Sequence, residues 1–346
     1  MSLSLYVDGD RWRAHMRGLL DLQPGLVPVI KGNGYGFGNA RLARKAEWLG
    51  VDTVAVGTYD EVGDVESRYP GDILVLTPWR PFEQRVVYGD RLVHTVGRRE
   101  DLAALSARED RPRILLELLT SMRRHGFTAR GLREAGELLD PRRVALEGVA
   151  LHLPMAHGSH LGEVERLMTD VVAAGLRTTR VYVSHLTDEE MQRLAASYPD
   201  FEFSPRVGTR LWLGDRGALS TRASVLDSHQ VERGEVFGYR GRSAPKSGTI
   251  LVVSGGTAHG IGLEAPTAAG NLRQRAATVA KGGLDAAGFV RSPYTVGGKH
   301  RLFAEPPHMQ ASMLFLPHGA PVPAVGDEIE VRVRFTTTRF DRTVVS

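Results

Sequence analysis

The sequence contains no cysteine, which excludes disulfides, thiolate metal sites and a cysteine nucleophile. It also lacks an apolar run of about 18 residues, the minimum for a membrane-spanning helix. No hydrophobic segment of a secretory signal precedes Asp8 and Asp10. The net charge is only +4, and the basic residues alternate with acidic ones instead of forming a basic stripe with aromatics. We therefore expect a cytoplasmic protein that binds neither membranes nor nucleic acids.

Lysine is scarce, because only five of the 44 basic residues are lysines and the rest are arginines. Arginine stays protonated and cannot form a Schiff base, whereas a lysine amine can. One of the lysines, Lys31, ends the short apolar run Val27–Ile30, which is too short for a helix and is typical of a buried strand. This places a single primary amine at the carboxyl end of a predicted strand, Leu26–Lys31.

Glycines follow this lysine at alternate positions, since residues 31–38 read K-G-N-G-Y-G-F-G. Glycine lets the backbone approach a ligand closely, and the N-terminus of the predicted helix Asn39–Leu49 offers free N–H groups to an anion. The spacing matches neither G-x-G-x-x-G nor a P-loop, so nucleotide binding is not predicted. A phosphorylated aldehyde cofactor fits the amine and the anion site. The alternative is a strand-end lysine that only pairs with a carboxylate.

The first two thirds of the chain alternate short apolar strands with helical patterns, which predicts a closed parallel (β/α)8 barrel over residues 10–220. Active sites of such barrels lie at the carboxyl ends of the strands, where Lys31, His152, His185 and Arg206 fall. The expected strands are Leu26–Lys31, Thr53–Gly57, Asp72–Thr77, Leu92–Val96, Arg113–Leu118, Leu146–Leu153, Arg180–His185 and Phe201–Val207.

From about Ala223 the helical periodicity ends and alternating stretches separated by Gly/Pro-rich turns predict a mainly antiparallel β domain over residues 221–346. Examples are Thr249–Val253, Met309–Phe315 and Glu328–Phe335. The Ala- and Gly-rich run Ala265–Arg291 is expected to be loop and short helix.

The run Lys31–Gly38 resembles the K-A-N-A-Y-G-H-G signature of alanine racemases, which are fold-type III enzymes that use pyridoxal 5'-phosphate (PLP). The resemblance extends weakly along nearly the whole chain. It implies a PLP-dependent amino-acid racemase, with residues 1–9 joining the C-terminal β domain. It also implies a homodimer whose active site lies at the interface, because in the family the C-terminal domain of a second subunit completes that site.

Several residues match cofactor-binding positions of the family. Residues 204–209, S-P-R-V-G-T, resemble the R-P-G-I segment, so Arg206 would donate to the pyridine nitrogen. An arginine there leaves that nitrogen unprotonated and weakens the ring as an electron sink. The resemblance assigns the other contacts as follows: the phosphate to Tyr35, Gly208 and Thr209 with help from Ser184, and support of the arginine to His152.

Residues 116–126 resemble the family's L-K-V-D-T-G-M-G-R-L-G segment. Arg124 matches the arginine that contacts the cofactor phenolic oxygen and the substrate carboxylate. The family lysine that is carbamylated in many members is Glu117 here, and a glutamate could supply a similar negative charge. Near the C-terminus, Met309 matches the residue whose backbone N–H helps bind the substrate carboxylate.

The chain departs from the family where racemisation needs a second acid/base group, on the face of Cα opposite the lysine. Residues 256–260, G-T-A-H-G, match the family's G-Y-A-D-G, so Thr257 stands where the catalytic tyrosine is expected. A threonine hydroxyl is a much weaker acid than a phenol, whose unperturbed pKa is about 10. His259 is the first candidate to replace it, and Tyr239 and Tyr294 are others. Thr338 likewise stands where a phosphate-binding tyrosine is expected.

Three hypotheses remain open. The protein is an amino-acid racemase with a different second base, or a PLP enzyme that performs chemistry on one face only, or a PLP-binding homologue without catalysis. A metal site is not predicted, because His157 and His160 lie beside Pro154 and Gly158 without a matching carboxylate spacing.

Overall fold

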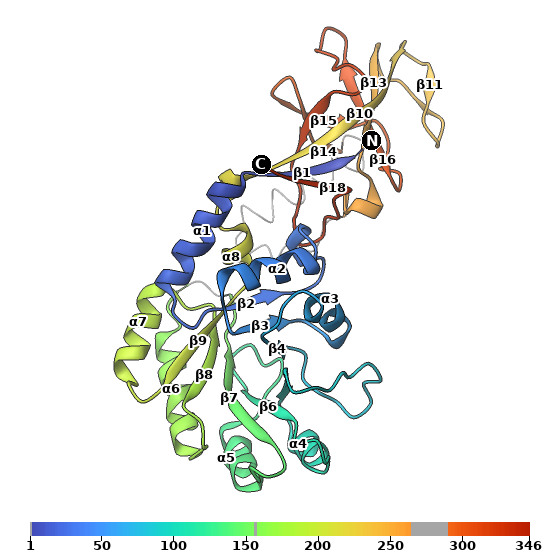
Figure 1. The fold of residues 1–346 in the computed structure, drawn as a ribbon. Coiled ribbons are helices and arrows are strands. Elements are labelled where there is room, and N and C mark those ends of the chain that lie inside the picture. The colour runs from blue at the N-terminus through green and yellow to red at the C-terminus, as the bar shows by residue number, and fades with distance from the viewer. Residues whose placement is uncertain (1, 156–157, 264–289) are drawn as a thin grey trace. The chain divides into compact units, whose positions relative to one another are not determined.

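The computed structural model describes residues 2–155, 158–263 and 290–346. The chain divides into two compact units, which are described separately (Figure 1). The barrel unit is Arg13–Gly214, and the C-terminal unit combines Met1–Trp12 with Asp215–Ser346.

The barrel unit is a closed barrel of eight parallel strands, as predicted. Consecutive strands pair in parallel, and β2 closes the ring by pairing with β9. Every predicted strand segment overlaps one of the observed strands, with differences of at most two residues at each end. The strands are β2 (Val27–Ile30), β3 (Thr53–Val56), β4 (Asp72–Val75), β5 (Leu92–Val96), β6 (Arg113–Leu118), β7 (Ala145–His152), β8 (Arg180–Ser184) and β9 (Glu202–Val207).

The interior of the barrel is filled by side chains from all strands except β9, and they form one buried cluster. Alternate residues of a strand point to opposite sides, so Val27 and Val29 of β2 face inward while Ile30 is buried against the outer layer. The barrel is therefore a packed core, and ligands can reach it only at its ends. The cluster is Val27, Val29, Ala55, Leu74, Val93, Leu115, Ala150 and Tyr182.

Helices follow most of the barrel strands and cover their outer side (Figure 1). Thr128 and Thr187 cap two of them, since each side chain accepts a backbone N–H of the first turn. The predicted helix Asn39–Leu49 has the observed bounds. The helices are α1 (Gly9–Leu22), α2 (Asn39–Leu49), α3 (Val62–Glu66), α4 (Arg99–Ser106), α5 (Ala129–Leu138), α6 (Leu161–Ala173), α7 (Asp188–Ser197) and α8 (Thr209–Leu213).

The C-terminal unit is built on one eight-stranded sheet in the order β13-β16-β15-β14-β17-β10-β1-β18. All its strand pairs are antiparallel except β1 with β18, which confirms the mainly antiparallel domain. The first strand of the chain, β1 (Leu3–Val7), belongs to this sheet. The others are β10 (Leu219–Val231), β13 (Gly248–Ser254), β14 (Arg291–Val296), β15 (Lys299–Phe303), β16 (Ala311–Pro317), β17 (Glu328–Val331) and β18 (Arg342–Val345), with a separate hairpin of β11 (Val236–Phe237) and β12 (Arg242–Ser243).

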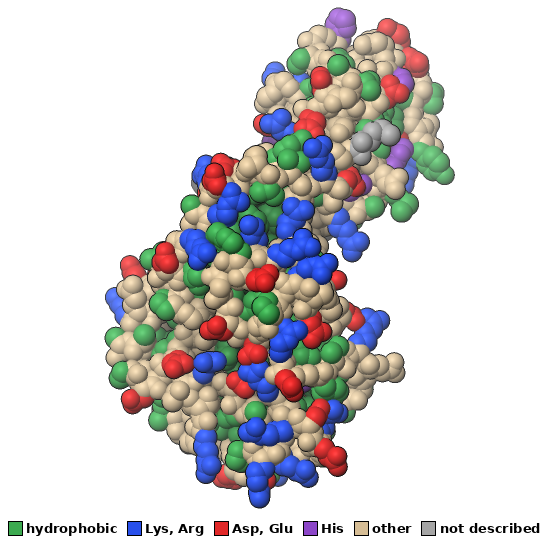
Figure 2. Space-filling model, in the orientation of Figure 1, with side chains coloured by type: hydrophobic (Ala, Val, Ile, Leu, Met, Phe, Trp, Pro, Cys, Tyr) green, Lys and Arg blue, Asp and Glu red, His purple; other side chains and the backbone are tan. Residues whose placement is uncertain are grey.

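The surface carries charges of both signs. Figure 2 shows acidic and basic side chains interspersed on the visible face of the barrel unit. Arg113, for example, contacts both Asp72 and Glu147. Within the described ranges, no helix is long and apolar enough to cross a membrane. Most of the predicted loop Ala265–Arg291 lies outside the described residues, but Arg291 itself begins β14.

Candidate active site

Lys31 directly follows β2 at the carboxyl end of the barrel. All four residues of β2 are buried, whereas Lys31 is exposed. Its amine is therefore accessible from solvent. Partial desolvation by the surrounding strand ends lowers the pKa of Lys31, the positive charge of Arg124 lowers it further, and the carboxylate of Glu61 opposes both. A lowered pKa increases the fraction of free amine, the form that attacks an aldehyde.

The loop after Lys31 requires glycine for its backbone path. Gly34 has a positive φ of 60°, and a Cβ there would come within 2.6 Å of the Asn39 backbone nitrogen. Tyr35 itself has a φ of 54°, which is unusual for a residue with a side chain. Glu61 holds the start of this loop, since its carboxylate accepts the N–H of Gly32 at 2.7 Å.

Tyr35 lies against the backbone at the end of β9. A Cβ on Gly208 would overlap the tyrosine hydroxyl, so only glycine leaves room for it there. Burial raises the pKa of Tyr35 to about 12, with a smaller contribution from Glu61, so the phenol is a neutral donor at physiological pH. Its hydroxyl makes no hydrogen bond within the described part of the chain. The Tyr35 hydroxyl thus lies against Gly208, which Thr209 follows in the chain, and has no acceptor among the described residues; we call these three residues the cradle.

Arg206 of β9 is 7% exposed and makes one hydrogen bond, from Nη2 to the Leu151 carbonyl at 3.2 Å. Its Nε is buried and has no partner among the described residues. Burial lowers the pKa of Arg206 to about 10, against the raising effect of Glu117, so the guanidinium remains charged at neutral pH. A buried N–H of a charged group without an acceptor is costly, which indicates a missing partner at this position.

Glu117 of β6 is 4% exposed, and its Oε2 likewise has no hydrogen-bond partner in the described ranges. Burial raises the pKa of Glu117, and the positive charges of Arg206, Arg124 and Arg80 oppose that rise. The carboxyl group lies within the field of three arginines, and the expectation that it replaces the charge of the family's modified lysine stays a prediction. Its role in orienting Arg124 stays a prediction.

His152 and Ser184 lie at the ends of neighbouring strands, with Ser184 Oγ 2.9 Å from His152 Nδ1. Burial first, and then the charges of Arg206 and Arg124, lower the pKa of His152 to about 3, so the ring is neutral. The predicted roles, support of Arg206 by His152 and phosphate binding by Ser184, stay predictions. In the structure the serine hydroxyl contacts the histidine, and the hydrogen bond of Arg206 goes to Leu151.

Two further residues lie at this end of the barrel: Glu61 was not predicted, and His185 was placed at a strand end but given no role. Glu61 accepts three backbone N–H groups, from Gly32 at 2.7 Å, from Gly57 at 2.6 Å and from Thr58 at 3.3 Å. His185 has a φ of 63° and an edge-to-face contact with His152, with ring centroids 5.5 Å apart. Both follow predicted strands closely, and that position at a carboxyl end was the signal that could have identified them.

In the C-terminal unit, Thr257 and His259 share the short 3-10 helix Thr257–His259. His259 uses both ring nitrogens, because Nδ1 accepts the Gly256 N–H at 3.2 Å and Nε2 lies 3.0 Å from an Asp341 carboxylate oxygen. Neither nitrogen of this ring is free to exchange a proton with a ligand while these bonds are intact.

The remaining candidates of the C-terminal unit differ in accessibility. Tyr239 is 91% exposed and Met309 is 71% exposed. Tyr294 is fully buried, and its hydroxyl donates to the Ser254 and Gly255 carbonyls at 2.9 Å each. The suggestion that Tyr294 could be a second base is therefore wrong, because this side chain is part of the core.

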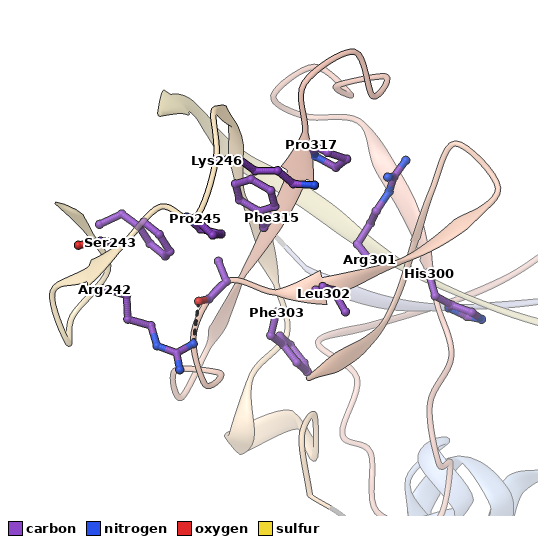
Figure 3. Close-up of a pocket in the computed structure, with 12 residues that line it drawn as sticks. Arg242, Ser243, Pro245, Lys246, His300, Arg301, Leu302, Phe303, Phe315 and Pro317 are labelled. Atoms are coloured by element: carbon purple, nitrogen blue, oxygen red, sulfur yellow. Dashed lines mark hydrogen bonds between the residues drawn. The ribbon is translucent and has the colours of Figure 1, made fainter. Parts of the chain in front are cut away.

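Clusters of three or more metal-ligating side chains are absent from the described residues, and His157 lies outside them. A cavity of about 520 Å³ opens in the C-terminal unit between the β11–β12 hairpin and strands β15 and β16 (Figure 3). Arg242 borders it and donates to the Ala304 carbonyl at 3.1 Å, the bond drawn in Figure 3. None of the predicted site residues lines this cavity, so the case for an active site depends on the barrel end.

A family model described as "Alanine racemase, N-terminal domain" matches residues 7–197, more than half of the chain. The chain belongs to this family. An amino-acid racemase of Enterococcus faecalis is 24% identical over 274 residues, which cover 71% of this chain and 38% of that protein. An alanine racemase of Campylobacter jejuni strain 81-176 is 26% identical over 226 residues, which cover 62% of this chain and 65% of that protein. Each match spans less than two thirds of the relative.

Solved structures resemble the whole chain. The alanine racemase of Bartonella henselae with covalently bound pyridoxal phosphate has a TM-score of 0.70 at 17% identity, covering 96% of this chain and 91% of that one. A histidine racemase of Leuconostoc mesenteroides has a TM-score of 0.71 at 16% identity, covering 100% of this chain and 98% of that one. At these identities the likeness shows the fold that the alanine racemase family shares.

Proposed function

We propose that the protein is a PLP-dependent amino-acid racemase that acts at Cα and lacks the usual opposite-face tyrosine. Membership of the family and the covalently bound cofactor of the B. henselae relative support this. The observation that carries the proposal is the buried, unpartnered Nε of Arg206. It would supply an N–H donor to the pyridine nitrogen of PLP, and the described residues offer it no acceptor.

The residues at the barrel end fit the cofactor. Lys31 would hold its aldehyde carbon, and Arg206 Nε would donate to its ring nitrogen. The cradle of Tyr35, Gly208 and Thr209 would hold the phosphate, with the neutral phenol as a donor. When bound, PLP withdraws electrons from Cα and so makes the Cα proton removable.

The chain's own residues then bind the substrate and move protons. The exposed Arg124 would hold the substrate carboxylate, aided by the backbone N–H of the exposed Met309. Lys31 would take and return the proton on one face of Cα, and the lowered pKa of its amine increases the fraction of free base. Glu117 would balance part of the charge of the surrounding arginines.

We also propose a homodimer in which the C-terminal unit of a second copy supplies Met309 and the group for the opposite face. Thr257 stands at the position expected for that group, and both nitrogens of His259 are engaged. These two observations also support a second candidate function. In that case the protein is a PLP enzyme that exchanges the Cα proton on one face without racemising its substrate.

The test uses purified protein supplied with PLP. We expect a visible absorbance band that disappears on borohydride treatment and is absent in Lys31→Ala, whereas Lys299→Ala, which removes an exposed lysine of β15, keeps it. The protein is then incubated in D2O with each enantiomer of alanine, serine, lysine, arginine and histidine. Deuterium at Cα with mixed chirality supports a racemase, and deuterium with retained chirality supports the alternative. A protein that shows neither the absorbance band nor deuterium at Cα contradicts both the racemase and the one-face enzyme.

A further inference from the structure

A carboxylate and an imidazole form a close pair in the C-terminal unit. Glu305 Oε1 lies 2.7 Å from Nε2 of His308. The glutamate side chain is 1% exposed, whereas the histidine side chain is 44% exposed. A buried carboxylate that holds an accessible imidazole is the arrangement by which a histidine is oriented for proton transfer.

The carboxylate is held in place by the turn between β11 and β12. Its Oε1 accepts the N–H of Tyr239 at 3.1 Å, and its Oε2 faces the N–H of Arg240 at 3.5 Å. Gly238 has a φ of +73°, and a Cβ there would come within 2.5 Å of Glu305 Oε2. The turn therefore closes on Glu305, and only glycine allows this approach.

The carboxylate also selects the tautomer of His308. A proton on Nε2 is donated to Glu305, and in that neutral tautomer Nδ1 keeps its lone pair. Nδ1 makes no hydrogen bond within the described ranges. The ring lies edge-to-face against the exposed Tyr239, with centroids 6.4 Å apart. His308 thus presents a free basic nitrogen at the surface, beside an exposed phenol and the exposed Met309.

Other histidines of the described C-terminal unit lack this combination. His259 has both ring nitrogens engaged. His229 lies 3.4 Å from Asp227, but both side chains are more than half exposed. The ring of His300 contacts the Thr295 hydroxyl at 3.3 Å. Among the described histidines of this unit, only His308 combines a buried carboxylate on one nitrogen with a second nitrogen that has no partner.

The pair also lies beside Thr257, where an acid/base group is missing. The His308 carbonyl accepts the Thr257 N–H at 2.8 Å, and the Met309 carbonyl accepts the Ala258 N–H at 2.9 Å. These two segments therefore run side by side in the C-terminal unit. A histidine on one of them can take over the task for which the other has no suitable side chain.

We propose that His308 of a second copy is the catalytic acid/base for the face of Cα opposite Lys31 and that Glu305 is its positioning residue; this rests on the proposed racemase function and its homodimer. In one direction Nδ1 takes the proton from Cα, the bonding pair stays with the substrate, and Lys31 returns a proton to the other face. In the reverse direction the two residues exchange tasks. One proton is removed and one returned, so no oxidant or reductant is consumed.

The kinetic test compares His308→Gln with His318→Gln, which changes an exposed histidine elsewhere in the same unit. With the amino acid of the five-member panel that the wild type racemises fastest, we expect His308→Gln to lose racemisation by about 100-fold or more. It should still exchange the Cα proton of one enantiomer in D2O, which shows that the protein is folded and holds PLP. His318→Gln should match the wild type.

Glu305→Gln should slow racemisation about 10- to 100-fold, the usual effect of removing an orienting partner. A second measurement needs no cofactor: ¹⁵N NMR of the cofactor-free protein should show His308 protonated at Nε2, with that tautomer lost in Glu305→Gln. Normal racemisation by both His308→Gln and His308→Asn overturns this inference and leaves the proposed function intact. A wild-type protein without visible band or exchange instead refutes the proposed function itself.

Discussion

At the barrel end, two buried polar atoms of the predicted site, Arg206 Nε and Glu117 Oε2, have no hydrogen-bond partner in the described chain. In the C-terminal unit, the predicted His259 and Tyr294 already have protein partners for their polar atoms. Because a buried polar group without a partner is costly, such atoms mark a place for a ligand, whereas satisfied groups are better explained as structural. His308 differs from both sets, because its side chain is 44% exposed and only one of its ring nitrogens has a partner among the described residues.

The two units also differ in the sign of their local charge. Arg206, Arg124 and Lys31 converge at the barrel end, and their charges lower the pKa of His152. Such a field favours an anionic ligand such as a phosphate or a carboxylate. In the C-terminal unit the central charge is instead the buried carboxylate of Glu305, which favours a protonated or proton-donating partner. One unit is therefore suited to hold an anionic cofactor, and the other to handle a proton.

The largest effect that tests this difference between the barrel end and the C-terminal unit is expected at Arg206 and Glu117. Arg206→Met leaves the buried Glu117 without its closest compensating charge, and we expect the free energy of unfolding in urea to fall by about 3 kcal/mol. Adding Glu117→Gln should recover part of this loss, so the two effects are not additive. A loss below about 1 kcal/mol in the single variant would show that this pair is not a coupled, buried unit.

Tyr35→Phe tests the cradle directly. Removing the phenolic donor should weaken PLP binding about 10- to 100-fold, because a hydrogen bond to a charged group contributes roughly 1.5–3 kcal/mol. Absorbance titration with PLP measures the change. Tyr198→Phe is the matched control, since that hydroxyl donates to the Glu165 carbonyl on the barrel's outer helices. Equal affinity of Tyr35→Phe and wild type would remove the tyrosine from the phosphate site.

A smaller effect is expected for His152 as the pH is lowered. Its pKa is about 3 in the folded protein and about 6.5 in an unfolded chain, so the unfolded state binds more protons between these values. Stability therefore falls as the pH drops from about 6.5 towards 3, by at most about 1.4 kcal/mol per pH unit. His152→Gln should flatten this slope in urea unfolding of the cofactor-free protein. An unchanged slope would mean that His152 is already solvated in the folded state.

Much of the fold could be predicted from local patterns. Apolar runs of four to eight residues, separated by helical periodicity, located all eight barrel strands, and the predicted helix Asn39–Leu49 has the observed bounds of α2. The same patterns placed Lys31, His152, His185 and Arg206 at strand ends. The inclusion of β1 in the C-terminal sheet depended on the family resemblance, because nothing local indicates that residues 3–7 pair with residues more than 200 positions away.

The order of elements and the place of the lysine–glycine segment were thus determined by the sequence itself, since hydrophobic period and glycine conformational freedom act over a few residues. Only the tertiary structure decided which polar atoms have partners. It pairs His259 with Asp341, 82 positions away, joins Ser184 to His152, and leaves Arg206 Nε alone. Hydrogen bonding depends on positions in space to within a fraction of an ångström, and these positions are fixed only when distant strands are packed together.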